Sequence, residues 1–413
     1  AGDAVGNSPS ALNLIFPEVF LDDGGRAERI ESIHRTMRRY LADGVFAAPR
    51  RGFVYIERDT PFNHGRRGLV AAVDLEQYDW LPQSRPLIRP TEGTVPERLP
   101  PRMDIRRGGC LETPHILLLI DDDTDSLLKT LGERAKKASP AYQGELMLNS
   151  GSIGGWFLDS PDDWAFFAEK LEELSRRALT RYAVGNAPGE QPFLFAVGDG
   201  NHSLASAKGI WEEYKAKHGN GSNLPDHPCR YALVEIENIY DPAIKFEPIH
   251  RVVFGLGFNE TLTLLAALPG FSSRETSTRE ELVRLTAEPV DGNRYGIISE
   301  GRYAVVTTSA GGIATASLQP LLDKAVSSGS SLSIDYIHGE DELFRLAKEH
   351  SVLVPPAQVP PVLVPVTGIL LPPVQKAGFF DTIARHGPLP RKSFSMGEAW
   401  EKRFYIECRK LFG

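Results

Sequence analysis

The chain has 413 residues, enough for about two domains, because a single hydrophobic core rarely grows beyond about 250–300 residues. Hydrophobic residues make up 41% and charged residues 24%, which is typical of a soluble globular protein. The formal net charge of −8 argues against a nucleic-acid-binding surface, since such surfaces usually carry a basic excess.

The cysteines and the apolar runs indicate the compartment. The three cysteines, Cys110, Cys229 and Cys408, are far apart, which argues against a zinc knuckle or a disulfide scaffold and suits a reducing environment. No run of about 18 apolar residues could span a bilayer, and the N-terminus lacks the pattern of a signal peptide. We therefore expect a cytoplasmic protein that contacts neither membrane nor nucleic acid.

The first part of the chain alternates predicted helices and strands. Apolar spacing predicts a helix over residues 26–43, followed by a hairpin with strands at 52–57 and 68–73. Residues 82–114 show no periodicity and are expected to form a long loop, a kind that is usually functional or disordered. A strand at 116–120, helices at about 124–138 and 161–182, and a buried strand at 193–197 come next.

Further strands are predicted at 231–236 and 251–254, and the composition shifts at about 255–260. Beyond that shift we expect a strand at 303–307, helices near 319–327 and 340–350, a strand at 362–366 and a last helix at about 397–411. These patterns predict an α/β protein with one domain at residues 1–256 and a second α/β domain at 257–413, which could close over a site in the first.

The most informative segment is the loop Gly198-Asp199-Gly200-Asn201-His202-Ser203, between a buried strand and a helix. Unpaired N–H groups at a helix start attract anions, and glycines let a phosphate approach closely. Asp199 could hold a metal ion or take a proton, and His202 could contact phosphate or act as an acid–base group. The alternative is a tight turn in which Asp199 and Asn201 only cap the helix.

A second candidate is the loop at residues 88–94. Glu92 could be a general base or a metal ligand, and the arginines that follow it, Arg98 among them, could clamp a phosphate or a carboxylate. An ordinary charged surface loop is the alternative.

Three other groups of polar residues are candidates. The pair His250-Arg251 could line a pocket or bind phosphate, but a structural pair is slightly favoured. The acids Asp121–Asp123 could bind a metal, although acids after a strand are more often helix caps. Asp335, His338 and Asp341 could form a cluster, but a solvated helix start is favoured.

The run Phe195–Lys208 resembles the signature of a bacterial family of unknown function with an A-D-G-H-H-R type loop. Segments Arg67–Val70, Thr91–Thr94, Pro248–Val253 and Pro390–Ser393 resemble other parts of that family in the same order. The loop is also similar to that of the ParB/sulfiredoxin-like superfamily, which includes free-serine kinases, sulfiredoxins and the nucleotide-binding part of ParB.

This resemblance implies a ParB/sulfiredoxin-like nucleotide-binding core with insertions in the first domain. It implies that the loop residues Gly198–Ser203 face a phosphate of ATP or another nucleoside triphosphate, with Mg²⁺ at Asp199 and with Glu92 activating a hydroxyl. The chain departs from the family at Asn201, where the family has His, and at Ser203, where the family has Arg.

The leading expectation is a kinase that uses ATP and Mg²⁺ to phosphorylate a small hydroxylated metabolite such as a serine-like amino acid. Catalytic roles would fall to Glu92, Asp199 and His202. Two alternatives stay open: a regulatory protein resembling ParB that binds or hydrolyses nucleotide, and an enzyme that reuses the loop for a carboxylated substrate. A homodimer is compatible with the sequence.

Overall fold

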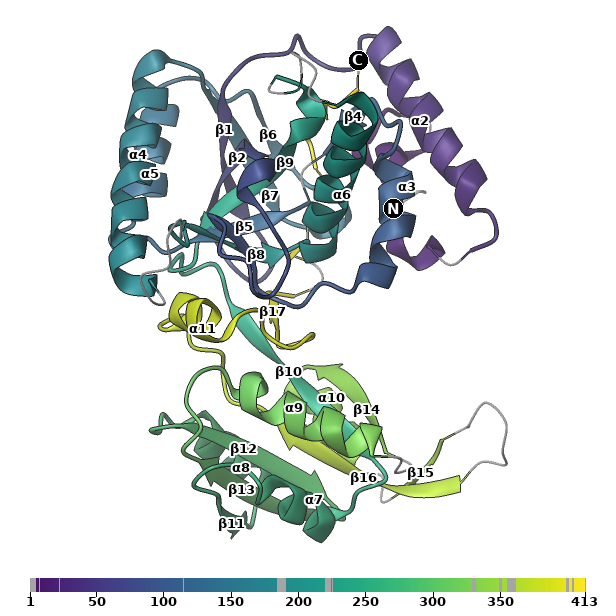
Figure 1. Cartoon of the computed structure of the whole chain (residues 1–413), viewed down its shortest axis with the longest axis vertical. Coiled ribbons are helices and arrows are strands. Elements are labelled where there is room, and N and C mark those ends of the chain that lie inside the picture. Colours follow the sequence, from purple (N-terminus) through teal and green to yellow (C-terminus); the bar gives the residue numbers. More distant parts are fainter. Residues whose placement is uncertain are drawn as a thin grey trace. The chain divides into compact units, whose positions relative to one another are not determined.

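The computed structural model describes residues 5–6, 8–21, 23–113, 115–183, 191–219, 224, 226–328, 332–348, 351–354, 362–398, 401–402 and 405–412. The chain divides into two compact units (Figure 1). The first unit comprises Ala1–Ile244 together with Glu398–Gly413, and the second comprises Lys245–Gly397. The sequence placed one boundary near residue 256. In the structure the division follows Ile244, and the last residues return to the first unit.

The first unit is built on an eight-stranded mixed sheet, in which β3 is parallel to β8, β5 is parallel to β9, and the other neighbours are antiparallel. The strands, in sheet order, are β3 (Ile88–Pro90), β8 (Phe195–Asp199), β5 (Leu117–Ile120), β9 (Tyr231–Asn238), β2 (Arg66–Asp74), β1 (Phe53–Asp59), β7 (Ser152–Leu158) and β6 (Tyr142–Glu145).

Helices α4 and α5 lie side by side against this sheet, and α3 packs against α6 (Figure 1). Helix α6 begins immediately after β8 and buries the apolar side chains Leu204, Ile210 and Trp211 in the main hydrophobic core, so the core holds its first turns in place. The helices are α2 (Arg26–Ala42), α3 (Leu99–Arg106), α4 (Ser126–Ala135), α5 (Pro161–Tyr182) and α6 (Asn201–His218).

Short elements complete this unit. Two short strands, β4 (Leu111–Glu112) and β18 (Arg409–Lys410), pair with each other and join the end of the chain to its first half. The 3-10 helices are η1 (Ala11–Leu14), η2 (Glu18–Phe20), η3 (Leu75–Gln77), η4 (Pro96–Arg98), η5 (Met147–Asn149) and η6 (Pro228–Arg230).

The second unit is a three-layer arrangement around an antiparallel sheet. Neighbouring strand residues alternate between two cores: Val253 and Ile297 pack with α7 (Phe258–Leu265) and α9 (Ala314–Ser327), and Val252 and Ile298 pack with α8 (Arg279–Ala287) and α10 (Glu340–Ala347). The strands are β11 (Ser272–Thr276), β13 (Arg302–Thr308), β12 (Asn293–Ser299), β16 (Val362–Leu370), β10 (Phe246–Phe254) and β14 (Ser333–His338), with β15 (Ser351–Val354) on β16 and β17 (Phe394–Met396) on β10. Helix α11 (Phe379–His386) follows β16.

The predicted α/β class is confirmed, but two local predictions are wrong. The expected loop at 82–114 contains β3 and α3. Strand β3 has only three residues, too few to show a period, and α3 carries Pro100 and Pro101 in its first turn, where proline is tolerated. The helix expected at 397–411 is absent from the described residues of that range, which include the strand β18. Residues 399–400 and 403–404 lie outside the described residues.

Among the described residues, no helix is both long enough and apolar enough to cross a bilayer.

The returning C-terminal segment is held by one buried carboxylate. Glu401 is 3% exposed, and its side chain accepts hydrogen bonds from the Thr60 hydroxyl (3.0 Å), the Asn63 amide (2.8 Å) and the backbone N–H of Glu398 (2.8 Å). The carbonyl of Glu401 accepts a hydrogen bond from the Arg58 guanidinium (2.7 Å). Thr60 and Asn63 follow β1, so Glu401 ties the end of the chain to the β1–β2 turn.

We expect Glu401→Ala to lower the free energy of unfolding by about 1–3 kcal/mol, because it leaves the buried Asn63 amide without its acceptor. Glu401→Gln keeps one accepting oxygen and should lose less. Urea unfolding of the three proteins measures this order. An alanine variant as stable as the wild type would show that the carboxylate does not hold the segment.

Candidate functional site

Strand β8 ends at Asp199, and α6 begins at Asn201, so a single residue, Gly200, makes the turn between them. Gly200 has a left-handed φ of 84°, a conformation that other residues rarely adopt. A Cβ atom at this position would lie 2.9 Å from the carbonyl oxygen of His115. Both the backbone angle and the available space therefore require glycine at the start of the helix.

The two candidate loops meet at one edge of the sheet. Because β3 and β8 are parallel, their carboxyl ends, which lead into Thr91 and into Gly200, point the same way. The Thr91 hydroxyl donates to the carbonyl of Val197 (2.6 Å), and the Thr91 N–H donates to the side-chain oxygen of Asn201 (3.2 Å). The Asn201 amide nitrogen in turn donates to the Thr91 hydroxyl (3.4 Å). Asn201 therefore bridges the loops instead of only capping its helix.

His202 and Ser203 contact the surrounding loops. The Nε2 atom of His202 accepts a hydrogen bond from the backbone N–H of Val95 (3.2 Å), which requires this nitrogen to be unprotonated. The Ser203 hydroxyl lies 2.6 Å from Nε2 of His115. Ser203 is thus hydrogen-bonded within the protein.

Asp199 forms an ion pair that the sequence did not predict. Its Oδ1 accepts from the N–H of Gly200 (2.8 Å), and its Oδ2 lies 3.1 Å from Nζ of Lys402. Both side chains are open to solvent, with exposed fractions of 41% for Asp199 and 69% for Lys402. Lys402 is not predictable from the sequence, because the pattern of residues 397–411 favours a helix and no local signal shows that this segment returns to β8.

Glu92 and Arg98 lie in the segment that follows β3. Glu92 is half-buried and comes directly after Thr91, so it lies at the same sheet edge as Asp199. Arg98 is exposed at the end of η4, just before α3, and in the described part of the chain its guanidinium has no hydrogen bond or ion pair.

His250 and Arg251 lie in the second unit. The His250 Nδ1 accepts from the N–H of Leu371 (3.1 Å), and burial, with the charges of Arg251 and His338, lowers the pKa of His250 to about 4. Arg251 is fully buried, and its Nε donates to the Gln319 side chain (2.7 Å). Both side chains are therefore held within their own unit.

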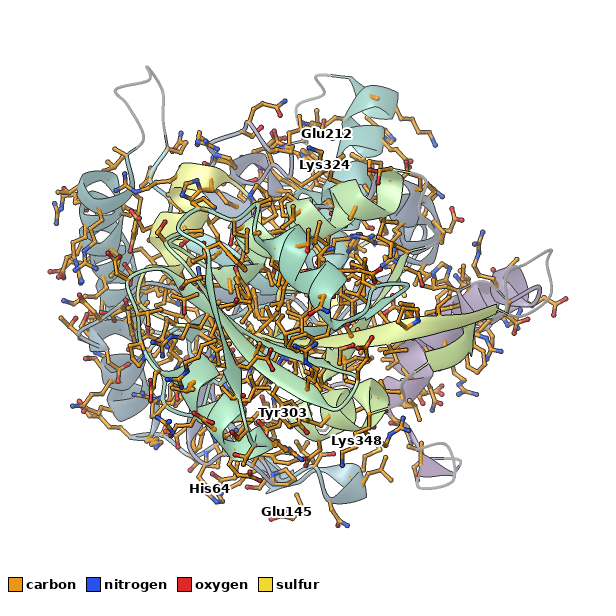
Figure 2. All side chains as sticks on the ribbon, turned by 90° about the horizontal axis from the view of Figure 1, so that it is seen from below. His64, Glu145, Glu212, Tyr303, Lys324 and Lys348 are labelled. Carbon is orange, nitrogen blue, oxygen red and sulfur yellow. The ribbon has the colours of Figure 1, made fainter. Side chains whose placement is uncertain are left out.

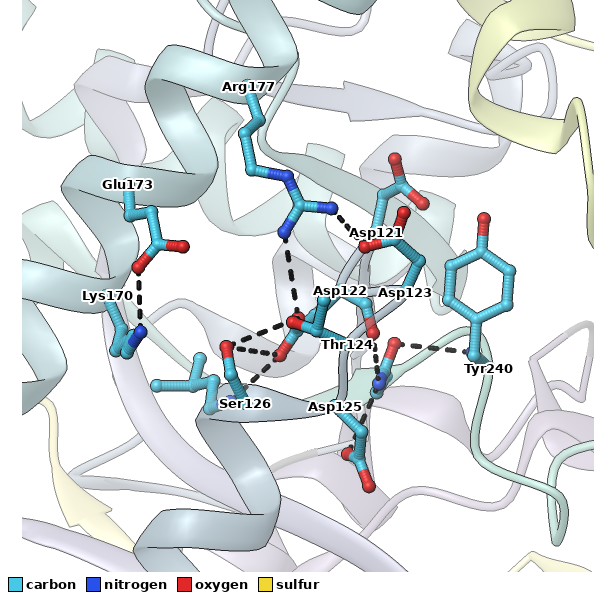
Figure 3. Close-up of polar contacts among 12 residues, drawn as sticks. Asp121, Asp122, Asp123, Thr124, Asp125, Ser126, Lys170, Glu173, Arg177 and Tyr240 are labelled. Atoms are coloured by element: carbon cyan, nitrogen blue, oxygen red, sulfur yellow. Dashed lines mark hydrogen bonds and ion pairs between the residues drawn. The ribbon is translucent and has the colours of Figure 1, made fainter.

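The acidic run after β5 contributes to packing (Figure 3). Asp122 is fully buried, and its Oδ2 accepts from the N–H of Leu127 (2.8 Å) at the start of α4. Arg177 forms an ion pair with Asp123. The acids thus cap a helix and anchor α5.

The candidate cluster of Asp335, His338 and Asp341 does not form a site. Asp341 pairs with Arg279, and His338 lies 2.7 Å from the Ser395 hydroxyl. Across the described ranges, no group of three histidine, cysteine or acidic side chains is placed to hold a metal.

The chain belongs to the family described as "Protein of unknown function (DUF1015)", whose sequence profile matches residues 3–325. The expected resemblance to a family of unknown function is thereby confirmed. The segments around Pro390–Ser393 and Lys402 lie beyond the matched residues. No curated protein matches this chain.

Several solved structures are similar to this chain at low identity. A free serine kinase mutant in complex with AMP is 13% identical, with 89% of this chain and 95% of that chain covered and a TM-score of 0.40. A conserved hypothetical protein from Pyrococcus furiosus is 12% identical, with 83% and 94% covered and a TM-score of 0.36. SbnI with a C-terminal truncation, from Staphylococcus aureus, is 12% identical, with 80% and 83% covered and a TM-score of 0.34.

The contacts of Asn201 and Asp199 predict different effects of substitution on stability. We expect Asn201→Ala to lower the free energy of unfolding by about 1–3 kcal/mol, since the buried Thr91 loses its partner. Asp199→Asn should cost less than about 1 kcal/mol, because an exposed ion pair contributes little. Denaturant unfolding of both variants checks this. If Asp199→Asn proved the more damaging change, Asp199 would be a structural cap.

Proposed function

We propose that the first unit binds the phosphates of ATP, or of another nucleoside triphosphate, at Gly198–Ser203, and transfers the terminal phosphoryl group to a small hydroxylated metabolite. The observation that carries the proposal is the joining of two loops by Thr91 and Asn201 at a helix start. Helix N-termini attract phosphate through their unpaired N–H groups, and the left-handed Gly200 lets α6 begin directly after Asp199.

The residues of the loop fit one Mg²⁺ ion. Mg²⁺ at phosphate sites is usually bound by one or two carboxylates, by water and by the phosphates themselves, so a large acidic cluster is not required. Asp199 supplies a half-exposed carboxylate directly beside the proposed phosphate position. A bound ion would neutralise phosphate charge there.

In the proposed reaction, the metabolite hydroxyl attacks the terminal phosphorus. The new oxygen–phosphorus bond forms as the bond to the oxygen bridging the last two phosphates breaks, and the nucleoside diphosphate leaves. Glu92 would accept the hydroxyl proton, because it lies in the loop that Thr91 holds against Asn201. His202 would contact the phosphates after its hydrogen bond from Val95 is exchanged.

Lys402 would supply the cation that the loop lacks at Ser203. An ammonium group binds phosphate as a point charge. The exposed Lys402–Asp199 pair contributes little to stability, so its side chain can move to a ligand at small cost. Its backbone is held in place by the buried neighbour Glu401.

The central assay measures ADP release from ATP and Mg²⁺, with pooled amino acids and polyols as acceptors. We expect release that depends on one hydroxylated compound and that is lost in Asp199→Ala, a variant that stays folded. Equal release with and without acceptors would instead favour a nucleotide-hydrolysing regulator of the ParB-like kind. If no nucleotide raised the melting temperature, phosphate binding itself would be refuted.

A second experiment tests Lys402. We expect Lys402→Ala to weaken ATP binding by about tenfold, equivalent to ~1.4 kcal/mol, and Lys402→Arg to restore most of it, because either cation can pair with phosphate. Calorimetric titration provides the affinities. Lys410→Ala is the matched control, since it removes the same charge from an exposed position in the same terminal segment. Equal affinities for the two alanine variants would remove Lys402 from the site.

A further inference from the structure

The first unit contains a cavity of about 670 Å³ beside the proposed phosphate loop. This volume lies within the range of small-molecule pockets. One wall is the segment from Glu76 to Pro86, and the other is α6, with Leu99 at the start of α3 between them. Every lining residue belongs to the first unit, and neither the loop Gly198–Ser203 nor Lys402 is among them.

The cavity follows the helix face that begins at the loop. Its α6 residues are Ala205, Lys208, Gly209 and Glu212, spaced so that they share one side of the helix with Asn201. Glu212 is exposed at the far end of this face and is labelled in Figure 2. From Asn201 to Lys208 the helix rises about 10 Å, comparable to the separation between phosphates and base in an extended nucleotide.

The opposite wall is tied to the strand that leads into the site. Tyr78 pairs with Ile88, the first residue of β3, in a parallel bridge. Tyr78 is almost fully buried, and Trp80 packs partly buried against the same core. Six of the thirteen lining residues are aromatic or apolar: Tyr78, Trp80, Leu81, Pro86, Leu99 and Ala205. Such a wall suits a flat ring.

The charges of the cavity argue against a second phosphate site. Its lining has three carboxylates, Glu76, Asp79 and Glu212, against two cations, Lys208 and Arg85, a formal charge of −1. Lys208 is already paired with Glu212 (2.8 Å). Burial opposes ionisation of Glu76, but hydrogen bonds from Lys215 and Trp211 prevail and lower its pKa to about 2, so it is charged at pH 7.

The remaining polar groups offer both donors and acceptors. Ser84 and the N–H of Leu81 donate to the Asp79 carboxylate, which shapes the rim of the cavity. Arg85 donates to the backbone carbonyls of Pro82 (3.4 Å) and Ser84 (3.2 Å), and no carboxylate is paired with it in the described part of the chain. Mixed donors and acceptors around an apolar wall match the polar edge of a heterocycle.

We infer that this cavity binds the base of the nucleotide whose phosphates lie at Gly198–Ser203. The inference rests on the proposed nucleotide binding. It adds a site for the base, which is the part of a nucleotide that phosphate alone lacks. The base stacks on the partly buried Trp80, and the phosphates extend along α6 to the helix start.

The test compares ATP with inorganic tripolyphosphate, which has the phosphates but no base. Trp80→Ala should weaken ATP binding by about tenfold, as expected for a lost stacking contact, and leave tripolyphosphate binding unchanged. Lys402→Ala should weaken the binding of both ATP and tripolyphosphate. Trp80 contributes to the core, so Leu81→Ala serves as a second variant, with an expected loss of about threefold for ATP alone.

Leu179→Ala on α5 is the matched control, because Leu179 is 43% exposed and Leu81 is 42% exposed. Wild-type affinity for ATP in the Trp80 and Leu81 variants would overturn the base assignment while leaving phosphate binding intact. An equal loss for ATP and tripolyphosphate, or a raised KM for the acceptor alone, would also overturn it. If the wild type bound neither ligand, the proposed function would fail together with this inference.

Discussion

The parallel pairing of β3 with β8 is the constraint on which the site depends. It places two strand ends side by side although Glu92 and Asp199 are 107 residues apart (199 − 92). The hydrogen bonds between Thr91 and Asn201 then fix the two loops to each other. Without this pairing, Gly200 would be an ordinary tight turn. With it, a helix start and a carboxylate-bearing loop share one edge of the sheet.

The C-terminal segment also reaches this edge of the sheet, where Lys402 pairs with Asp199, and buried hydrogen bonds rather than strand pairing hold it there. Buried polar groups must be hydrogen-bonded, and Glu401 satisfies this by accepting from Thr60 and Asn63. The cost of disturbing that arrangement keeps the segment in place, whereas the neighbouring Lys402 side chain is exposed and forms an ion pair with Asp199. A buried anchor next to an exposed cation suits the proposed exchange of the Asp199 carboxylate for a ligand.

Much of this architecture could be predicted from local signals. The strand, glycine turn and helix at 193–214 follow from apolar runs and glycine placement, and Ser160 correctly marks the start of α5. Strand β3 escaped prediction because three residues are too few to show a period. It is recognised as a strand only by its pairing with β8. Lys402 escaped prediction because its position depends on the long-range hydrogen bonds of Glu401. The contacts of His250 and Arg251 likewise depend on residues distant in the sequence, Leu371 and Gln319.

The central claim is that nucleotide phosphates lie at the start of α6. A crystal structure of the full chain with Mg²⁺ and a non-hydrolysable ATP analogue tests this most directly. The account predicts phosphate oxygens within hydrogen-bonding distance of the backbone N–H groups of Asn201–Ser203, with the Asp199 carboxylate beside them. Phosphates bound elsewhere on the protein, with the Thr91–Asn201 loops empty, would contradict it.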